Sequence, residues 1–363
     1  MSPQEFSDLH AGLRRLRAQG FAGGAALATL VQTRGPVFRR AGARMLVCGD
    51  GSIVRGLSAG CPEADIIERS RAVIASGEAR LLRYDREQGY DVMLELGCGG
   101  EMEILLAPLQ HADDLRFADA VAEALQQRTD GLLFTVFAQG AHCLQRPRHL
   151  VWSRDVLLDE LDDPALRSSL LAQYQNAEAL PAVQLCELAT ASGALRVLIE
   201  RLRPPLRLTL IGINTTTLAL TRLGRSMGWQ VCIVDHREDT PAPMLADDAL
   251  FLRATPPQLR QRVELDARTA VVVMTHNLER DIDYLHALAA QPLAYLGALG
   301  SRVRAAKMHA AIGSGSVPLH APAGLDIGSE TPEEIALAIA AEIQAAVNGH
   351  AGGRLSAGDG PIH

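Results

Sequence analysis

Apolar runs alternate with amphipathic segments throughout the C-terminal part of the chain. The short apolar runs, each typical of a buried strand, lie at 207–212, 230–235, 269–276 and 293–300. Stretches with helical spacing follow them, clearest at 217–228, 279–290 and 301–312. Strand and helix alternating at this spacing predict a parallel sheet with right-handed crossovers. A last helix is expected after Thr331, which with Pro332 and Glu334 forms a capping-box sequence.

The N-terminal part mixes helices with paired strands. Apolar runs predict strands at 25–33, 44–48, 81–85, 101–109, 132–139, 149–153 and 195–202. The Asp50-Gly51 turn predicts a hairpin after the second of these. Helical patterns are expected at 61–76, 113–128 and 157–180.

These patterns predict an α/β protein with two domains. A mixed α+β domain is expected at 1–190 and a Rossmann-like domain with a parallel sheet at 195–347. The Pro204-Pro205 pair interrupts the chain before the second sheet begins. The glycine-rich, polar tail at 348–363 is predicted to be disordered.

Composition narrows the class of partner. The chain has 363 residues, 48% of them hydrophobic, and a formal net charge of −7. Basic residues are scattered and do not form the stripe that nucleic acids require, so no nucleic-acid partner is expected. The sequence has no 18-residue apolar stretch and no signal-like N-terminus, so we expect no membrane association and a cytoplasmic location.

Two of the six cysteines lie among glycines. Cys48, Cys143, Cys186 and Cys232 lie in apolar runs and are interpreted as small buried side chains. Cys61 follows Gly60 at a predicted helix start, near Glu63, where the helix dipole lowers a thiol pKa. The other lies in the loop Gly97-Cys98-Gly99-Gly100. Such loops leave backbone N–H groups free for a ligand, but they can equally form a simple turn.

The turn after the first C-terminal strand departs from a dinucleotide-binding fingerprint. It reads Gly212-Ile213-Asn214-Thr215-Thr216-Thr217, so only the first of the three expected glycines remains. Ordinary dinucleotide binding is therefore disfavoured, although Asn214, Thr215, Thr216 and the helix N–H groups could still receive one phosphate. Asp235 stands where a ribose-binding carboxylate is expected, and its alternative role is to cap a strand end.

Two further groups of polar residues border glycines or strand ends. His236 and His276 lie at predicted carboxyl ends of strands, the ligand edge of a parallel sheet, where a structural histidine is the alternative. Four arginines lie near two glycines, namely Arg34, Arg39, Arg40 and Arg44. Their guanidinium groups could hold a phosphate or a pterin carbonyl, or they could line a solvated hairpin.

Several blocks in this order resemble the XdhC/CoxI family of xanthine dehydrogenase accessory proteins. They include "LVQTRGPVFRRAGARMLVCGDGSIVRGLSAGCPEAD", "LGCGGEMEILLAPL", "VVMTHNLERDIDYL", "AYLGALGSRVRAAK" and "GLDIGSETPEEIA". The resemblance implies an XdhC/CoxI-type N-terminal domain and a Rossmann-like C-terminal domain. It implies a homodimeric chaperone that carries molybdopterin-type molybdenum cofactor, in a dinucleotide form or without the nucleotide. The chaperone would protect the cofactor during sulfuration by a cysteine desulfurase and deliver it to a xanthine dehydrogenase or aldehyde oxidase-type molybdoenzyme.

The resemblance also transfers positions. The family's Ser-Gly-Gly-Cys becomes Ser58 to Cys61, with Ala59 in place of glycine, and the Gly97–Gly100 loop is intact. Either Cys61 or Cys98 would lie near the molybdenum. The turn after Gly212 lacks the family histidine, whereas His276 and Asn277 stand at the family's Thr-His-Asp position. The family's Gly-Ser-Arg is retained as Gly300, Ser301 and Arg302.

Two other functions remain open. An NAD(P)-dependent oxidoreductase would use Asp235 to bind the ribose, but the sequence shows no Tyr-x-x-x-Lys pair or comparable catalytic pair. A dimeric scaffold would dock the molybdoenzyme without holding cofactor. The resemblance favours an accessory protein that catalyses no reaction itself.

Overall fold

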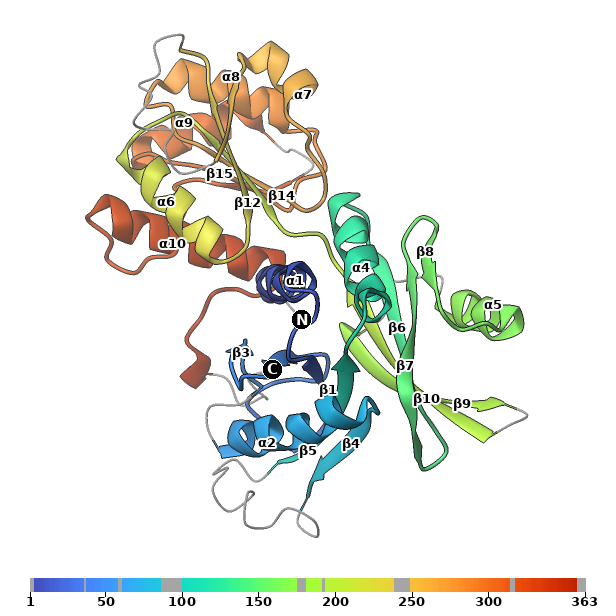
Figure 1. Ribbon diagram of the computed structural model, residues 1–363. Coiled ribbons are helices and arrows are strands. Elements are labelled where there is room, and N and C mark those ends of the chain that lie inside the picture. The colour runs from blue at the N-terminus through green and yellow to red at the C-terminus, as the bar shows by residue number, and fades with distance from the viewer. Residues whose placement is uncertain are drawn as a thin grey trace. The chain divides into compact units, whose positions relative to one another are not determined.

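A computed structural model describes residues 3–35, 37–57, 61–85, 100–174, 181–190, 193–237, 249–313 and 317–357. The chain forms two compact units, Met1–Pro204 and Pro205–His363 (Figure 1). The division falls within the Pro204-Pro205 pair, where two prolines prevent a strand from continuing.

The described strands of the N-terminal unit form two antiparallel sheets. The first has the order β3-β2-β1-β5-β4 and the second β8-β7-β6-β10-β9. The strands of the first sheet are β1 (Ala25–Arg34), β2 (Arg44–Cys48), β3 (Ile53–Val54), β4 (Arg80–Tyr84) and β5 (Glu101–Leu109). Those of the second are β6 (Gly131–Gln139), β7 (His142–Trp152), β8 (Val156–Asp159), β9 (Val183–Thr190) and β10 (Gly193–Leu202).

Helices cover both sheets of this unit. They are α1 (Pro3–Ala18), α2 (Cys61–Ser76), α4 (Arg116–Gln126), which follows the 3-10 turn η1 (Ala112–Leu115), and α5 (Pro164–Gln173). Alternate residues of β1 pack on α2, while α1 and α4 share a core cluster with strands of both sheets. Helix α5 packs on the second sheet (Figure 1). Val31, Leu105, Phe137 and Leu198 join the two sheets directly.

The described strands of the C-terminal unit form one parallel sheet, as predicted. Its order is β13-β12-β11-β14-β15-β16, in which the chain changes direction across the sheet between β11 and β14. The strands are β11 (Arg207–Ile211), β12 (Gln230–Asp235), β13 (Leu250–Arg253), β14 (Thr269–Val273), β15 (Tyr295–Ala298) and β16 (Leu319–His320).

Helices lie on both faces of this sheet (Figure 1). The clusters place α6 (Thr215–Ser226) and α10 (Pro332–Val347) on one face. The other face carries α7 (Leu259–Arg262), which follows η4 (Pro256–Gln258), together with α8 (Leu278–Leu288) and α9 (Arg302–Ile312). The strand order and the two helical layers confirm the Rossmann-like prediction.

Several local predictions are confirmed. Helix α2 has the predicted bounds, and β2 and β3 form the hairpin that Asp50-Gly51 indicated. At the start of α10, the Thr331 hydroxyl accepts a hydrogen bond from the Glu334 N–H, and the Glu334 carboxylate accepts one from the Thr331 N–H. The disorder expected at 348–363 stays a prediction, since the structure describes this tail only to residue 357 and places the short η5 (Leu355–Ala357) in it.

Two predictions in the N-terminal unit differ from the structure. The helix expected at 157–180 is replaced over its first residues by β8, because Leu158 packs into the core that α4 covers. Only Pro164–Gln173 is helical, and residues 175–180 lie outside the described part. The strand expected at 195–202 to open the second domain is β10, which pairs with β6 and β9 and so belongs to the N-terminal unit.

Candidate functional site

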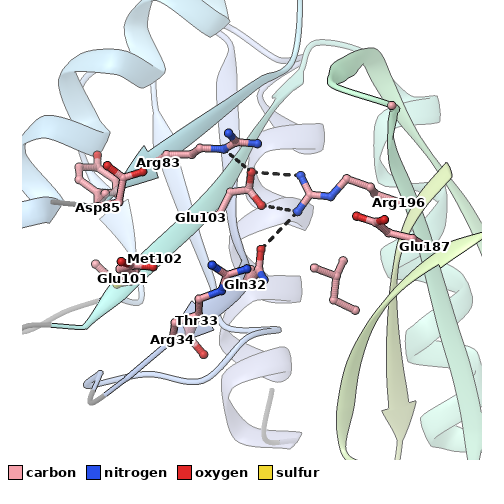
Figure 2. Close-up of a pocket in the computed structure, with 13 residues that line it drawn as sticks. Gln32, Thr33, Arg34, Arg83, Asp85, Glu101, Met102, Glu103, Glu187 and Arg196 are labelled. Atoms are coloured by element: carbon pink, nitrogen blue, oxygen red, sulfur yellow. Dashed lines mark hydrogen bonds and ion pairs between the residues drawn. The ribbon is translucent and has the colours of Figure 1, made fainter. Parts of the chain in front are cut away.

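A polar pocket lies between the two sheets of the N-terminal unit (Figure 2). Its volume is about 380 Å³, within the range typical of small-molecule sites. The carboxyl ends of β1 and β4, the first residues of β5, the β6–β7 turn, β9 and β10 line it. The lining residues are Gln32, Thr33, Arg34, Arg83, Tyr84, Asp85, Glu101, Met102, Glu103, Gly140, Leu185, Glu187 and Arg196.

A bulge in β1 changes the register beside this pocket. The pairing of β1 with β5 shifts between Leu30 and Gln32, where β1 carries one extra residue. A β-bulge redirects the side chains that follow it, and here those side chains belong to Gln32, Thr33 and Arg34, which line the pocket.

A buried ion-pair cluster forms the floor of the pocket. Glu103 and Arg196 are 6% and 9% exposed, and their charged groups form a bidentate pair, with Nη1–Oε1 at 3.1 Å and Nη2–Oε2 at 2.5 Å. Arg83 Nε donates to Glu103 Oε1 at 2.9 Å, and the Arg196 guanidinium lies 5.0 Å from the Phe137 ring centroid. Burial alone would raise the pKa of Glu103, but the hydrogen bonds from Arg196 and Arg83 outweigh it and lower that pKa.

This floor is preorganised for hydrogen bonding. Glu103 stays ionised near neutral pH and fixes the orientation of the Arg196 fork. Gln32 lies at the edge of the cluster, where its Oε1 is 3.5 Å from Arg196 Nη2. Donors and acceptors therefore lie side by side on a rigid surface, which suits recognition of a polar ring.

The predicted residues of the N-terminal unit are partly brought together. Arg34 lines the pocket, and Gly100 adjoins Glu101 at its wall. Glu63 packs elsewhere in this unit, where a Cβ placed on Gly56 would lie 2.3 Å from Glu63 Oε1. Cys61 begins α2. The remaining predicted positions Gly60, Gly97, Cys98 and Gly99, and the Cys61 side chain, lie outside the described residues.

The four arginines do not converge on one ligand. Arg44 is buried and forms a bidentate pair with Glu200, in which Nη1 is 2.7 Å from Oε1. Arg39 pairs with Glu5. Arg34 alone of the four lines the pocket, because the bulge directs the end of β1 there.

In the C-terminal unit, the turn after β11 requires its single glycine. Gly212 has φ of +102°, and a Cβ there would lie 2.7 Å from the Met274 carbonyl oxygen. The turn therefore approaches the end of β14 closely at the point where the strand order reverses.

Asn214 closes this turn instead of leaving it open for a pyrophosphate. Its Oδ1 accepts from the Thr217 N–H at 3.0 Å, and its Nδ2 donates to the Met274 carbonyl at 3.0 Å. The fully buried Thr217 hydroxyl donates to the Gly212 carbonyl at 2.9 Å. Thr215 is exposed at the helix start, whereas Thr216 is buried. The side chains that replace the glycines therefore bind the protein's own backbone.

The carboxylate of Asp235 is also engaged. Asp235 is 1% exposed and pairs with Arg237, whose Nη2 lies 2.8 Å from Oδ2. Arg237 Nη2 also donates to the Ile213 carbonyl at 3.3 Å. Burial would raise the pKa of Asp235, but the hydrogen bonds from Arg237 outweigh it and lower that pKa. This arrangement uses the carboxylate for a structural pair.

The remaining predicted residues surround the carboxyl edge of the same sheet. His276 is exposed with φ of +63°, and its carbonyl accepts from Arg304 Nη1 at 3.0 Å. The Asn277 side chain caps α8 by accepting from the Arg280 N–H, and Ser301 caps α9. Gly300 adjoins that cap, and Arg302 is exposed at the helix start. His236 has a lowered pKa because of its burial and the nearby Arg280 charge.

Sequence reasoning missed the floor of the pocket. Glu103 and Arg196 lie among buried apolar residues of β5 and β10, and a charge inside a buried strand indicates a buried partner. The sequence does not show which charged residues pair with each other, because Glu103 and Arg196 are 93 positions apart.

The described residues contain neither a metal-binding cluster nor a membrane-spanning helix. Within those ranges, no group of three or more His, Cys, Asp or Glu side chains is placed to hold a metal ion. In the same part of the chain, no helix combines the length and hydropathy needed to cross a membrane.

Two family models and several named relatives match the sequence. Residues 22–85 match the model of the XdhC and CoxI family, and 208–343 match the XdhC Rossmann domain. A probable xanthine dehydrogenase subunit from Bacillus subtilis is 27% identical over 330 residues, covering 88% of this chain and 92% of the relative. Molybdenum cofactor insertion chaperone PaoD of Escherichia coli is 26% identical over 328 residues, covering 88% and 82%.

A solved structure shares the fold. A crystal structure described as a xanthine dehydrogenase from Bacillus halodurans matches with a TM-score of 0.77. The match covers 99% of this chain and 98% of that one at 21% sequence identity.

Proposed function

This chain belongs to the XdhC and CoxI family, and on that premise we propose that it is a molybdenum cofactor insertion chaperone for a molybdoenzyme of the xanthine dehydrogenase type. The names of two relatives that align with most of the chain support this role. The chain would protect the cofactor while a cysteine desulfurase sulfurates it and then deliver it, without catalysing a reaction of its own. It would act in the cytoplasm as a homodimer.

The pocket of the N-terminal unit is the observation that carries this proposal. Its volume and its fixed donors and acceptors fit a polar heterocyclic cargo. Asp85 and Glu101 both line it, and the segment between them in the sequence contains the Gly97–Gly100 motif. The motif that the family resemblance singled out therefore lies in the sequence directly before Glu101, which lines the pocket.

Arg34, Arg83, Arg196 and Gln32 would hold the cargo by hydrogen bonds, and the two sheets would exclude water from one side. Cys98, or Cys61 at the start of α2, would contribute a thiol near the molybdenum. Gly60, Glu63, Gly97, Gly99 and Gly100 would shape the adjoining backbone. We propose a secondary role in cargo binding for the C-terminal edge, through the exposed residues Thr215, His276 and Arg302. The residues that would shape this edge are Gly212, Asn214, Thr216, Asp235, Asn277, Gly300 and Ser301.

The test is cofactor content after anaerobic purification from cells that express the target molybdoenzyme. Pterin is released, oxidised and measured by fluorescence for each protomer. The parent chain should carry pterin, and Arg34→Gln should carry about tenfold less, since a charge-assisted hydrogen bond contributes about 1.5–3 kcal/mol. Arg40→Gln is the matched control, because Arg40 is exposed nearby but does not line the pocket. Pterin no higher than in an unrelated control protein would refute the proposal.

A cofactor-free scaffold predicts a different result. It should still mature its partner after Cys61→Ala and Cys98→Ala, whereas a carrier that uses either thiol should lose maturation of the molybdoenzyme in at least one variant. Enzyme activity in lysates, measured at matched chaperone levels, separates the two.

An NAD(P)-dependent oxidoreductase is less compatible with the C-terminal unit. The Asn214 side chain crosses the position where a pyrophosphate would approach, and Arg237 engages the Asp235 carboxylate. Titration with NADH or NADPH should therefore leave cofactor fluorescence unchanged, and a saturable shift would favour the oxidoreductase.

A further inference from the structure

Among the described residues, the pocket lining carries more negative than positive charge. These residues supply three guanidinium groups and four carboxylates, namely Arg34, Arg83 and Arg196 with Asp85, Glu101, Glu103 and Glu187. Anionic groups are attracted to sites with a positive excess, and the described part of the lining has no such excess. The balance disfavours a phosphate deep in the pocket.

The charges are also arranged by depth. Glu103 and Arg196 are buried at the floor and already paired with each other. Arg83 has a side chain that is 54% exposed, and Arg34 is exposed at the end of β1. The accessible guanidinium groups therefore lie toward solvent, whereas the deep part of the pocket is close to neutral.

Donors and acceptors lie side by side around Arg196, from the buried floor to exposed Glu187 on β9. Arg196 uses one N–H of each terminal nitrogen for Glu103, so its other N–H groups are those that could meet a ligand. Glu187 lies beside this guanidinium (Figure 2) and interacts with its charge. Glu103 uses both carboxylate oxygens as acceptors. A ring edge with a carbonyl next to N–H and NH2 groups is complementary to a guanidinium next to a carboxylate. The 2-amino-4-oxo edge of a pterin has this arrangement.

We propose that the pocket binds the pterin ring of the cargo by its 2-amino-4-oxo edge. The 4-oxo group meets Arg196, the 2-amino group meets Glu187, and the phosphate-bearing end remains at the mouth near Arg34 and Arg83. This inference rests on the proposed function and adds which end of the cargo enters.

The experiment titrates the purified full-length chain with two free heterocycles and follows their fluorescence. The probes are pterin and lumazine, which has a second oxo group in place of the 2-amino group. Pterin should bind about 10- to 100-fold more tightly, because lumazine places an oxygen against the Glu187 carboxylate. Inorganic phosphate should not displace pterin.

Glu187→Gln should reduce the preference for pterin over lumazine toward one. Glu123→Gln, on an exposed part of α4 away from the pocket, should retain the parent preference. Because the readout is a ratio within one protein, a change in folded fraction does not mimic the result. Equal binding of the two probes, displacement by phosphate, or no binding of pterin would each overturn the orientation.

Cofactor content in cells separates this inference from the proposed function. A chain that carries cofactor in cells but fails to prefer free pterin refutes only the orientation. A chain that prefers free pterin but carries no cofactor refutes the chaperone role.

Discussion

Asn214 should stabilise the C-terminal unit through two separable interactions. Its Oδ1 caps α6 through the Thr217 N–H, and its Nδ2 joins the β11 turn to the Met274 carbonyl. Asn214→Ala removes both. Asn214→Ser keeps a good capping oxygen but lacks the amide that reaches Met274.

The magnitude follows from burial at the two ends of Asn214. Loss of an N-cap costs about 1 kcal/mol. Met274 is 1% exposed, so its carbonyl loses a partner in a buried environment, at about 1–3 kcal/mol. We expect Asn214→Ala to lower the free energy of unfolding by about 3 kcal/mol and Asn214→Ser by about 2 kcal/mol. At ~2–4 °C per kcal/mol, the alanine variant should melt about 10 °C lower.

Trp229 provides a selective assay. The chain has two tryptophans, of which Trp152 lies in the N-terminal unit and Trp229 packs in the C-terminal core. In a Trp152→Phe background, fluorescence reports unfolding around Trp229 alone. The reasoning is refuted if Asn214→Ala unfolds within about 0.5 kcal/mol of its parent, or if serine is as destabilising as alanine.

Three further predictions concern glycine geometry and buried charge. Gly212→Ala should destabilise the C-terminal unit by about 2–5 kcal/mol in urea unfolding, because its Cβ would lie 2.7 Å from the Met274 carbonyl oxygen at a positive φ. Arg44→Met should cost the N-terminal unit about 3–5 kcal/mol by leaving Glu200 buried and unpaired, and the double variant Arg44→Met with Glu200→Leu should recover most of that loss. The pKa of Glu103 is lower in the folded chain than its ordinary value of 4.5. Ionised Glu103 should therefore stabilise the folded state fully above about pH 4.5, and this contribution should be lost as the pH falls further. Glu103→Gln should flatten the acid part of the plot of unfolding free energy against pH.

The fold of the C-terminal unit could be predicted because its sequence pattern is local. Each apolar run is long enough to form one buried strand, and each amphipathic stretch has one face to cover the sheet. The fold of the N-terminal unit was harder to predict from the sequence. Residues 157–159 lie in a sequence with a helical pattern, but they add β8 to the edge of β7, where Leu158 completes the core under α4. Sheet pairing overrode local propensity at that position.

The candidate sites also contain features that neighbouring residues predict and features that depend on distant contacts. The sequence showed the altered Gly212 turn, since a turn depends on neighbouring residues. The Gly97–Gly100 loop stays a prediction, because Gly97, Cys98 and Gly99 lie outside the described residues. The sequence did not show that Asn214 would turn its amide to a carbonyl 60 residues away. Of the two alternatives for the four arginines, a shared anion site is not what the structure shows for Arg44, whose partner Glu200 is 156 residues distant.

Neighbouring residues are enough to specify the alternation of elements, the helix caps and the need for glycine at position 212, because these features depend on contacts within one or two turns of chain. Only the tertiary structure shows that Glu103 pairs with Arg196 and that the bulged end of β1 lines the same pocket. Buried charges must find partners, but which strands bring the partners together depends on how two sheets pack. The pocket is a product of that packing.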